Sequence, residues 1–271
     1  MIKTESFKPQ EQEAGQAAPP PAQTPWGRIR KQFLLSKMAA AALLVFALLF
    51  VVAWGAPFFS PQNPYDLAAV SIVDAELPPG ARSEASGMLH VFGTDGAGRD
   101  LLSAIFYGLR ISMAVGLLSA MAALCIGTTA GLAAAYFGGR VDAFLMRIVD
   151  LQLSLPAILV ALVLLASLGQ GVDKTLLALV IVQWAYYARN VRGAALVEQQ
   201  REYVEAAMGQ GLPAGRIMFR HVLPNCMGTL IVTGTLQTAH AISLEATMSF
   251  LGIGLPQTEP SLGLLIANGF K

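Results

Sequence analysis

Long, nearly unbroken apolar runs are the feature that most restricts how this chain can fold. They lie at residues 38–59, 111–137, 148–168, 176–188 and about 226–250. A helix needs about 20 predominantly apolar residues to cross the hydrocarbon core of a bilayer. Only 13% of the residues are charged and 55% are hydrophobic, whereas soluble domains usually carry about 25% charged residues. The sequence therefore predicts an all-α, polytopic transmembrane helical bundle.

The five runs differ in length and in how apolar they are. Run 38–59 follows a basic, polar leader and lacks a clean small-residue cleavage site, which indicates an uncleaved anchor instead of a signal peptide. The leader, residues 1–37, has too few apolar residues to order itself, and we expect it to be disordered and cytoplasmic. The run at 176–188 is short unless it extends, and the last run is the least apolar.

The distribution of lysine and arginine predicts the orientation, because positively charged loops stay in the cytoplasm. With the N-terminus inside, thirteen lysines and arginines fall in inner segments and three in outer loops. The segment at 60–100 is then extracytoplasmic. Its acidic residues predict a solvated surface, with Asp100 as a possible helix cap. They are Asp66, Asp74, Glu76, Glu84, Asp95 and Asp100.

The predicted cytoplasmic segment at 189–225 has the regular spacing of apolar residues that a flexible linker lacks. Tyr203, Val204, Ala207, Met208, Gly211 and Leu212 recur at helical spacing, which predicts a short amphipathic helix. Gly211 can end that helix in the left-handed conformation, and Pro213 favours the start of a second one. Pro224 is expected to close the unit. The pair could lie on lipid headgroups or pack against the inner ends of the protein's own helices.

The same segment resembles the EAA loop of ABC importer permeases. Glu205, Ala206, Ala207, Gly211 and the Leu223–Pro224 pair stand at that motif's spacing. In the family this loop is the coupling helix that sits in a cleft of the ATPase subunit. The resemblance therefore implies an ATPase-docking loop, and the pattern His221-x-Leu-Pro-Asn is similar to the peptide, nickel and opine branch. The implied docking residues are Glu205, Ala206, Ala207, Gly211, Leu212, Pro213, His221, Leu223 and Pro224.

Other segments resemble the C-type subunit of dipeptide and oligopeptide permeases. The strongest is 92–116, FGTDGAGRDLLSAIFYGLRISMAVG, although Ala104 stands where the family often has arginine. Segments 61–66 and 244–254 are also similar, so that the resemblance covers about 37–269. It implies a type I ABC importer permease with its core at 101–271. Family members have six spans, and we expect this sequence to be truncated before the sixth.

Polar residues in the last run are functional candidates, because ionisable groups are costly inside a membrane. Helical spacing places Glu245 on one face with Thr238, and His240 on another with Thr233 and Gln237. One face could line the transport pathway and the other could pair with a neighbouring helix. Both roles remain open for Glu245.

Catalytic patterns are missing from the sequence. The nearest approach to a phosphate-binding loop, at 169–175, has Asp173 where the second glycine belongs. The three histidines are far apart and suggest neither a zinc site nor a triad. We therefore expect no enzyme and no cofactor, with ATP bound by partner subunits. A net charge of +1 gives no sign of nucleic-acid binding.

The resemblance implies a subunit of the bacterial inner membrane that imports di- or oligopeptides. Its partners would be a homologous permease, one or two cytoplasmic ATPases, an extracytoplasmic substrate-binding protein and membrane lipid. Nickel, opine and glutathione importers share these motifs and remain alternatives. A secondary transporter or a membrane scaffold is an alternative of another class.

Overall fold

The computed structural model describes residues 35–64, 66, 70–84, 86–256, 258–259 and 261–269. Most of the predicted leader at 1–37 lies outside these residues, so that its disorder stays a prediction. The chain divides into two compact units, Met1–Ala47 and Leu48–Lys271. Helix α2 (Lys37–Trp54) starts in the first unit and ends in the second.

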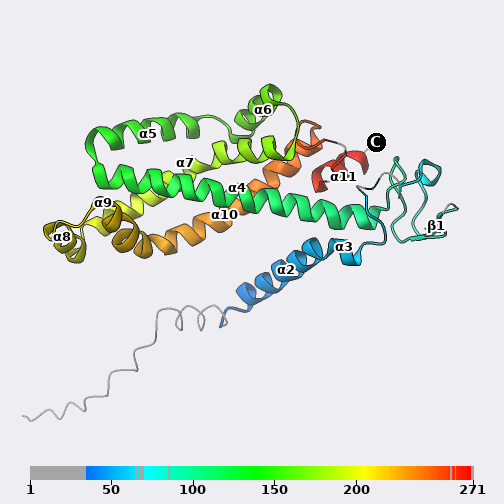
Figure 1. The fold of residues 1–271 in the computed structure, drawn as a ribbon, viewed down its shortest axis with the longest axis horizontal. Coiled ribbons are helices and arrows are strands. Elements are labelled where there is room, and N and C mark those ends of the chain that lie inside the picture. The colour runs from blue at the N-terminus through cyan, green and yellow to red at the C-terminus, as the bar shows by residue number, and fades with distance from the viewer. Residues whose placement is uncertain are drawn as a thin grey trace, which may run out of the picture. The chain divides into compact units, whose positions relative to one another are not determined.

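Three long helices form the centre of the second unit (Figure 1): α4 (Leu101–Phe137), α7 (Val172–Gln199) and α10 (Leu223–Phe250). Each of the three contacts the other two. The short run predicted at 176–188 is extended by helical residues on both sides. The resulting α7 has 28 residues, and at 1.5 Å per residue it is long enough to cross a bilayer.

Glycines allow α4 to approach α7 closely. A Cβ atom on Gly127 would lie 2.3 Å from the backbone oxygen of Trp184, and one on Gly131 would lie 2.5 Å from that of Ala188. Small residues four apart let two helix backbones meet, which is how many membrane helices pack. The Gly-x-x-x-Gly pattern at 127–131 was visible in the sequence, but we did not use it as a packing signal.

The third apolar run does not form one straight span, which corrects the prediction for 148–168. It belongs to two helices, α5 (Gly139–Ser154) and α6 (Ala157–Leu168), bent by 91°. Pro156 causes the break, because proline lacks an N–H donor and disfavours helix at the residue before it. Leu155 is accordingly extended. Arg192 and Arg189 of α7 pair with Asp142 and Asp150 of α5.

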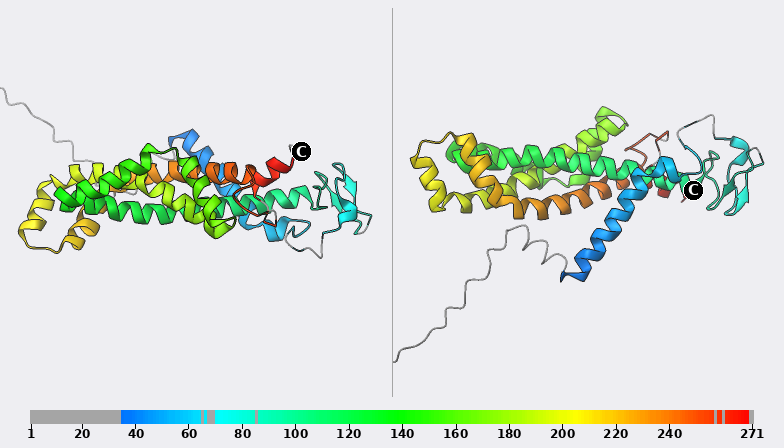
Figure 2. Two further views of the ribbon diagram at one scale, coloured as in Figure 1. Left: turned by 90° about the horizontal axis from the view of Figure 1, so that it is seen from above. Right: turned by 60° about the horizontal axis from the view of Figure 1, so that its bottom comes forward.

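The two ends of the bundle carry the connecting segments (Figure 2). At the end where α4 begins lie α3 (Ala56–Phe59), η1 (Ile72–Asp74) and an antiparallel pair, β1 (Ala81–Arg82) with β2 (Leu89–His90). We call this the outer end, after the extracytoplasmic position predicted for it. At the opposite end lie α8 (Glu202–Gly209), α9 (Ala214–Arg216) and the π-helical turn η2 (Ile217–Val222). We call this the inner end, after the cytoplasmic position predicted for it. We did not predict α11 (Leu262–Gly269), which packs on α10 and α4.

Two described helices, α2 and α4, are long and apolar enough to cross a membrane. The count is three if the bent pair α5–α6 is one span. The remaining two predicted spans lie in α7 and α10, which are long but carry more polar residues. The all-α membrane fold is thus confirmed, and the number of spans stays a prediction.

Candidate functional site

The predicted docking loop folds as two helical pieces around a glycine turn. Helix α8 is followed by Gly211, whose φ of +71° is the left-handed conformation expected of it. Pro213 directly precedes α9 and is extended. Because α7 continues to Gln199, the first part of the predicted loop at 189–225 is helical.

Pro224 does not close the unit, which corrects the prediction. Helix α9 passes through η2 directly into α10, and Leu223 has helical backbone angles. Pro224 stands in the first turn of α10, which directly follows the π-helical turn. The π-helical turn before Pro224 shifts the hydrogen-bond register at that point. The second helical piece of the loop and α10 are therefore one continuous element.

One face of the loop packs on the protein itself. Val204, Ala207, Ile217 and Val222 are buried in a cluster of apolar residues from α4, α7 and α10. The alternative in which the helix pair packs against the protein's own inner ends is thus realised for this face. The cluster partners are Leu132, Ala135, Val191, Ala195, Cys226 and Leu230.

The opposite face is open. Of the nine predicted docking residues, five are exposed, three are half-buried and Ala207 is buried. Tyr203 and Met208, which we placed on the apolar stripe, are each 41% exposed. A helix of only eight residues packed on one side buries a narrow stripe. The exposed residues are Glu205, Ala206, Gly211, Pro213 and Pro224, and the half-buried ones are Leu212, His221 and Leu223.

Four polar residues, which we call the polar clasp, tie the loop together: Glu198, Tyr203, His221 and Asn225. The Tyr203 hydroxyl donates to the Glu198 carboxylate. The Asn225 amide donates to the Tyr203 hydroxyl at 2.8 Å and to the His221 carbonyl at 2.9 Å. The clasp joins the end of α7, α8, η2 and the start of α10, and His221 takes part through its backbone carbonyl.

Tyr203 has a perturbed acidity. Partial burial, the hydrogen bond to Glu198 and the negative charge of that carboxylate raise the pKa of Tyr203 to about 12. The phenol therefore stays a neutral donor at every physiological pH. Apart from His221, the sequence reasoning did not assign these four residues to the site. A usable signal was the spacing of Asn225 four residues after His221.

The polar residues of α10 are arranged differently from the prediction. Glu245 is fully buried, and Gln237 and Thr233 are buried with it, whereas His240 is exposed. The buried face is wider than one stripe because α10 packs on both α4 and α7. Glu245 Oε1 accepts a hydrogen bond from Ser249 at 2.8 Å, and Thr233 accepts one from Asn190 of α7. Burial and Ser249 pairing favour the structural role for Glu245.

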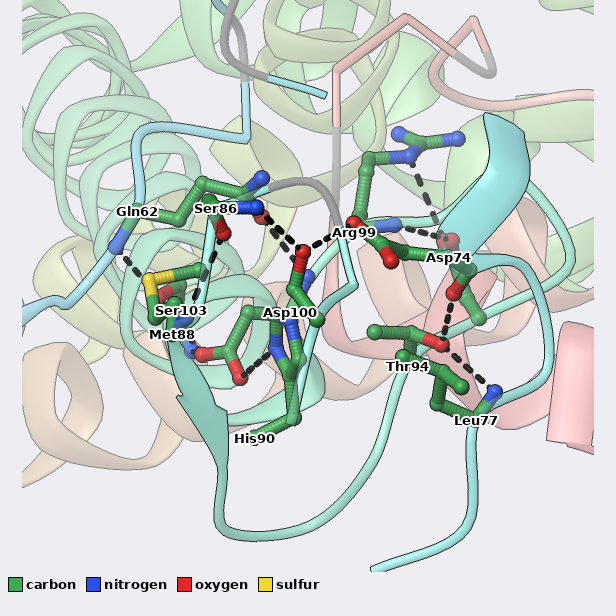
Figure 3. Close-up of polar contacts among 12 residues, drawn as sticks. Gln62, Asp74, Leu77, Ser86, Met88, His90, Thr94, Arg99, Asp100 and Ser103 are labelled. Atoms are coloured by element: carbon green, nitrogen blue, oxygen red, sulfur yellow. Dashed lines mark hydrogen bonds and ion pairs between the residues drawn. The ribbon is translucent and has the colours of Figure 1, made fainter. Parts of the chain in front are cut away.

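The segment before α4 is a folded cap held by buried polar groups (Figure 3). Asp100 is fully buried and caps α4, accepting hydrogen bonds from the backbone and hydroxyl of Ser103. His90 Nδ1 lies 3.0 Å from the other carboxylate oxygen. The side-chain oxygen of Gln62 accepts from the backbone N–H of Asp100 at 2.8 Å, and the backbone N–H of Gln62 donates to the Ser103 hydroxyl at 3.1 Å. We call these four residues the outer network.

The acidic residues of 60–100 do not all form a solvated surface, which corrects the prediction. Asp74 is buried and accepts from the Ser83 hydroxyl at 2.7 Å. Asp95 accepts from two backbone N–H groups and pairs with Arg99 at 3.2 Å. The Thr94 hydroxyl donates to the backbone carbonyl of Asp74 and accepts from the backbone N–H of Leu77. Much of the quoted motif at 92–103 is therefore explained by holding the cap together.

Two family models match the chain. Residues 126–270 match "Binding-protein-dependent transport system inner membrane component", and residues 24–79 match "N-terminal TM domain of oligopeptide transport permease C".

Curated relatives agree with these matches. The chain is 34% identical to the dipeptide transport system permease protein DppC of Alkalihalophilus pseudofirmus, over 98% of this chain and 86% of that protein. It is 34% identical to the oligopeptide transport system permease protein OppC of Bacillus subtilis, over 90% and 77%. It is 35% identical to the glutathione transport system permease protein GsiD of Pectobacterium atrosepticum, over 90% and 78%. The chain therefore belongs to the family of binding-protein-dependent transport system inner membrane components, as a permease subunit.

Proposed function

We propose that this chain is the permease subunit of an ABC importer of di- or oligopeptides, and that α8 and the turn after it dock into a cytoplasmic ATPase. Its N-terminus lies in the cytoplasm, and a binding protein delivers substrate at the end that carries the outer network. A homologous permease completes the pathway. ATP is bound and hydrolysed by the partner ATPase.

The observation that carries the docking proposal is the two-sided loop. Its back is anchored by buried Val204, Ile217 and Val222, while Glu205, Ala206 and Gly211 are exposed. A coupling element must transmit force as one piece. Continuity of η2 with α10 and the polar clasp both give the loop that property, so that a push on α8 reaches α10 directly.

Peptide is the proposed substrate because the relatives named above include dipeptide and oligopeptide permeases. Glutathione, transported by another named relative, is itself a peptide. Nickel and opines remain alternatives from the sequence motifs. Measuring uptake of labelled di- and tripeptides, nickel and an opine by the reconstituted transporter decides among them. Uptake of nickel or an opine without peptide uptake would overturn the proposal.

Docking is tested with Glu205→Lys, which reverses the charge of an exposed side chain. We expect ATP-driven uptake to fall at least tenfold, because reversing a charge at a contact with the ATPase should weaken docking by about 1.4 kcal/mol or more, which corresponds to a factor of ten. Glu202→Lys, at the start of the same helix, is the matched control. A cysteine at Ala206 should also crosslink to the ATPase. Equal uptake in both variants and no crosslink would contradict docking.

Orthovanadate separates the importer from a secondary transporter. It inhibits ABC ATPases, so that we expect uptake to stop when it is added. Uptake that survives the inhibitor, with no ATPase copurifying, would support a secondary transporter instead.

A further inference from the structure

A cavity lies beside α4 at its outer end, next to the outer network. Its volume is about 390 Å³, and its lining residues are Asn63, Tyr107, Arg110, Ile111 and Ala114. Four of these follow one another at spacings of three, one and three along α4, and so share one face of the helix. Cavities of about 300–1,000 Å³ are typical of small-molecule sites. The volume is therefore sufficient for a small peptide or its end.

Arg110 is the charged residue of this lining. It is half-buried and forms no ion pair or hydrogen bond with any residue in the part of the chain that the structure describes. Its neighbours in the lining are an amide, a phenol and two apolar side chains. The described lining thus offers a positive charge with no acidic side chain to neutralise it.

The chemistry of this lining suits a carboxylate. A guanidinium presents two parallel N–H groups that match the two oxygens of a carboxylate. Asn63 and Tyr107 supply further groups capable of donating, although each also makes another contact in the protein. Ile111 and Ala114 give an apolar surface for a small side chain. A divalent metal cation would be repelled by the same charge.

The outer network holds the site in place. Gln62, the neighbour of Asn63, is bonded to the backbone of Asp100 and to the Ser103 hydroxyl in the first turn of α4. Ser103 lies one helical turn before Tyr107. Because these bonds are buried, Asn63 is kept beside the face of α4 that carries Tyr107 and Arg110. Such preorganisation lowers the entropy cost of binding.

We propose that Arg110, Tyr107 and Asn63 form a carboxylate-binding pocket that receives the terminal carboxylate of the transported peptide as it enters the permease. This proposal rests on the proposed importer function. The pocket selects carboxylate-bearing substrates, a class that includes peptides and excludes free metal cations. The same anionic chemistry could come from a lipid phosphate, because Arg110 directly precedes the apolar run at 111–137.

The test uses the complete transporter in proteoliposomes, with its ATPases and binding protein. Uptake of a tripeptide with a free carboxylate is compared with uptake of the same tripeptide amidated at its C-terminus. We expect Arg110→Gln to lower uptake of the free acid about tenfold or more and to leave that of the amide unchanged. Arg110→Lys should recover part of the activity. Arg82→Gln, which removes an exposed cation of β1, is the matched control.

A second measurement reads binding directly. Phenylglyoxal modifies accessible arginines, and mass spectrometry follows Arg110 in transporter held in maltoside detergent. The free tripeptide should slow modification of Arg110 several-fold, and the amidated peptide should not. Protection by added anionic phospholipid, with none by peptide, would assign the pocket to a lipid headgroup and overturn the proposal. Protection by neither ligand would overturn it as well.

The outcomes separate this proposal from the function on which it rests. If the wild-type transporter takes up neither tripeptide, the peptide-importer function fails. If it takes up the tripeptide, but Arg110→Gln lowers uptake of acid and amide equally or of neither, only the carboxylate pocket fails.

Discussion

The two ends of the helical bundle are both tied together by small polar networks, but these differ in burial. At the outer end, Asp100 and His90 are 0% and 1% exposed. At the inner end, Tyr203 of the polar clasp is 41% exposed, and the loop is anchored mainly by apolar residues behind it. Hydrogen bonds in a buried, low-dielectric site are stronger, and breaking them costs more.

This difference suits the different tasks proposed for the two ends. A buried network keeps the outer cap in one arrangement, which a preformed substrate pocket requires. An apolar anchor with an open polar face holds the inner loop to its own helices and leaves a surface for a partner. The comparison predicts a graded series of stability effects, measured by thermal unfolding of the purified protein in detergent.

The largest effect is expected for Asp100→Ala. Removing this carboxylate leaves the Ser103 donors and the His90 ring without their partner, and should cost about 3 kcal/mol. Glu84→Ala, at an exposed residue of the same segment, should change the unfolding temperature little. Equal shifts for both variants would show that the outer network does not stabilise the cap.

Ile217→Ala should have the next largest effect. Ile217 is fully buried in the cluster behind the loop, and the cavity left by truncation should cost about 2 kcal/mol. Phe219, two residues further on, is 47% exposed, so Phe219→Ala serves as the control. If Phe219→Ala destabilised the protein more than Ile217→Ala, the apolar anchor would have been assigned to the wrong face.

Gly211→Ala tests the turn of the docking loop. An added Cβ meets no atom within 4 Å at either Gly211 or Gly209, but only Gly211 has a positive φ, +71°. Alanine at Gly211 should therefore destabilise by about 1 kcal/mol, whereas Gly209→Ala should be neutral or stabilising because Gly209 is helical. If both substitutions changed the stability in the same direction, the left-handed conformation of Gly211 would be contradicted.

Tyr203→Phe should have the smallest effect at neutral pH, about 0.5 kcal/mol, because the clasp is largely exposed. In the unfolded chain the phenol ionises near its ordinary pKa of 10.0, and in the folded chain near 12. The stabilisation is thus complete below pH 10 and is lost as the pH rises towards 12. Ultraviolet titration should lose one late-ionising tyrosine in Tyr203→Phe. An unchanged titration curve would contradict the clasp.

Patterns along the chain were enough to predict the membrane class, most of the long helices and a helix pair around Gly211. The hydropathy, the distribution of basic residues and the spacing from Glu205 to Pro224 can all be read directly from the sequence. The left-handed Gly211 and the Asp100 cap were predicted for the same reason, since each depends on a few neighbouring residues.

Tertiary structure decided what depends on partners distant in sequence. Asp74 looked solvated because nothing in the sequence shows that Ser83 donates to it. The sequence indicated the cap made by Asp100, but not that His90 and Gln62 lie against this residue. The buried face of α10 is wider than predicted because both α4 and α7 pack against it. Pro224 continues a helix because a π-helical turn precedes it. Burial is set by which surfaces meet in space, and the sequence alone specifies only which residues could tolerate it.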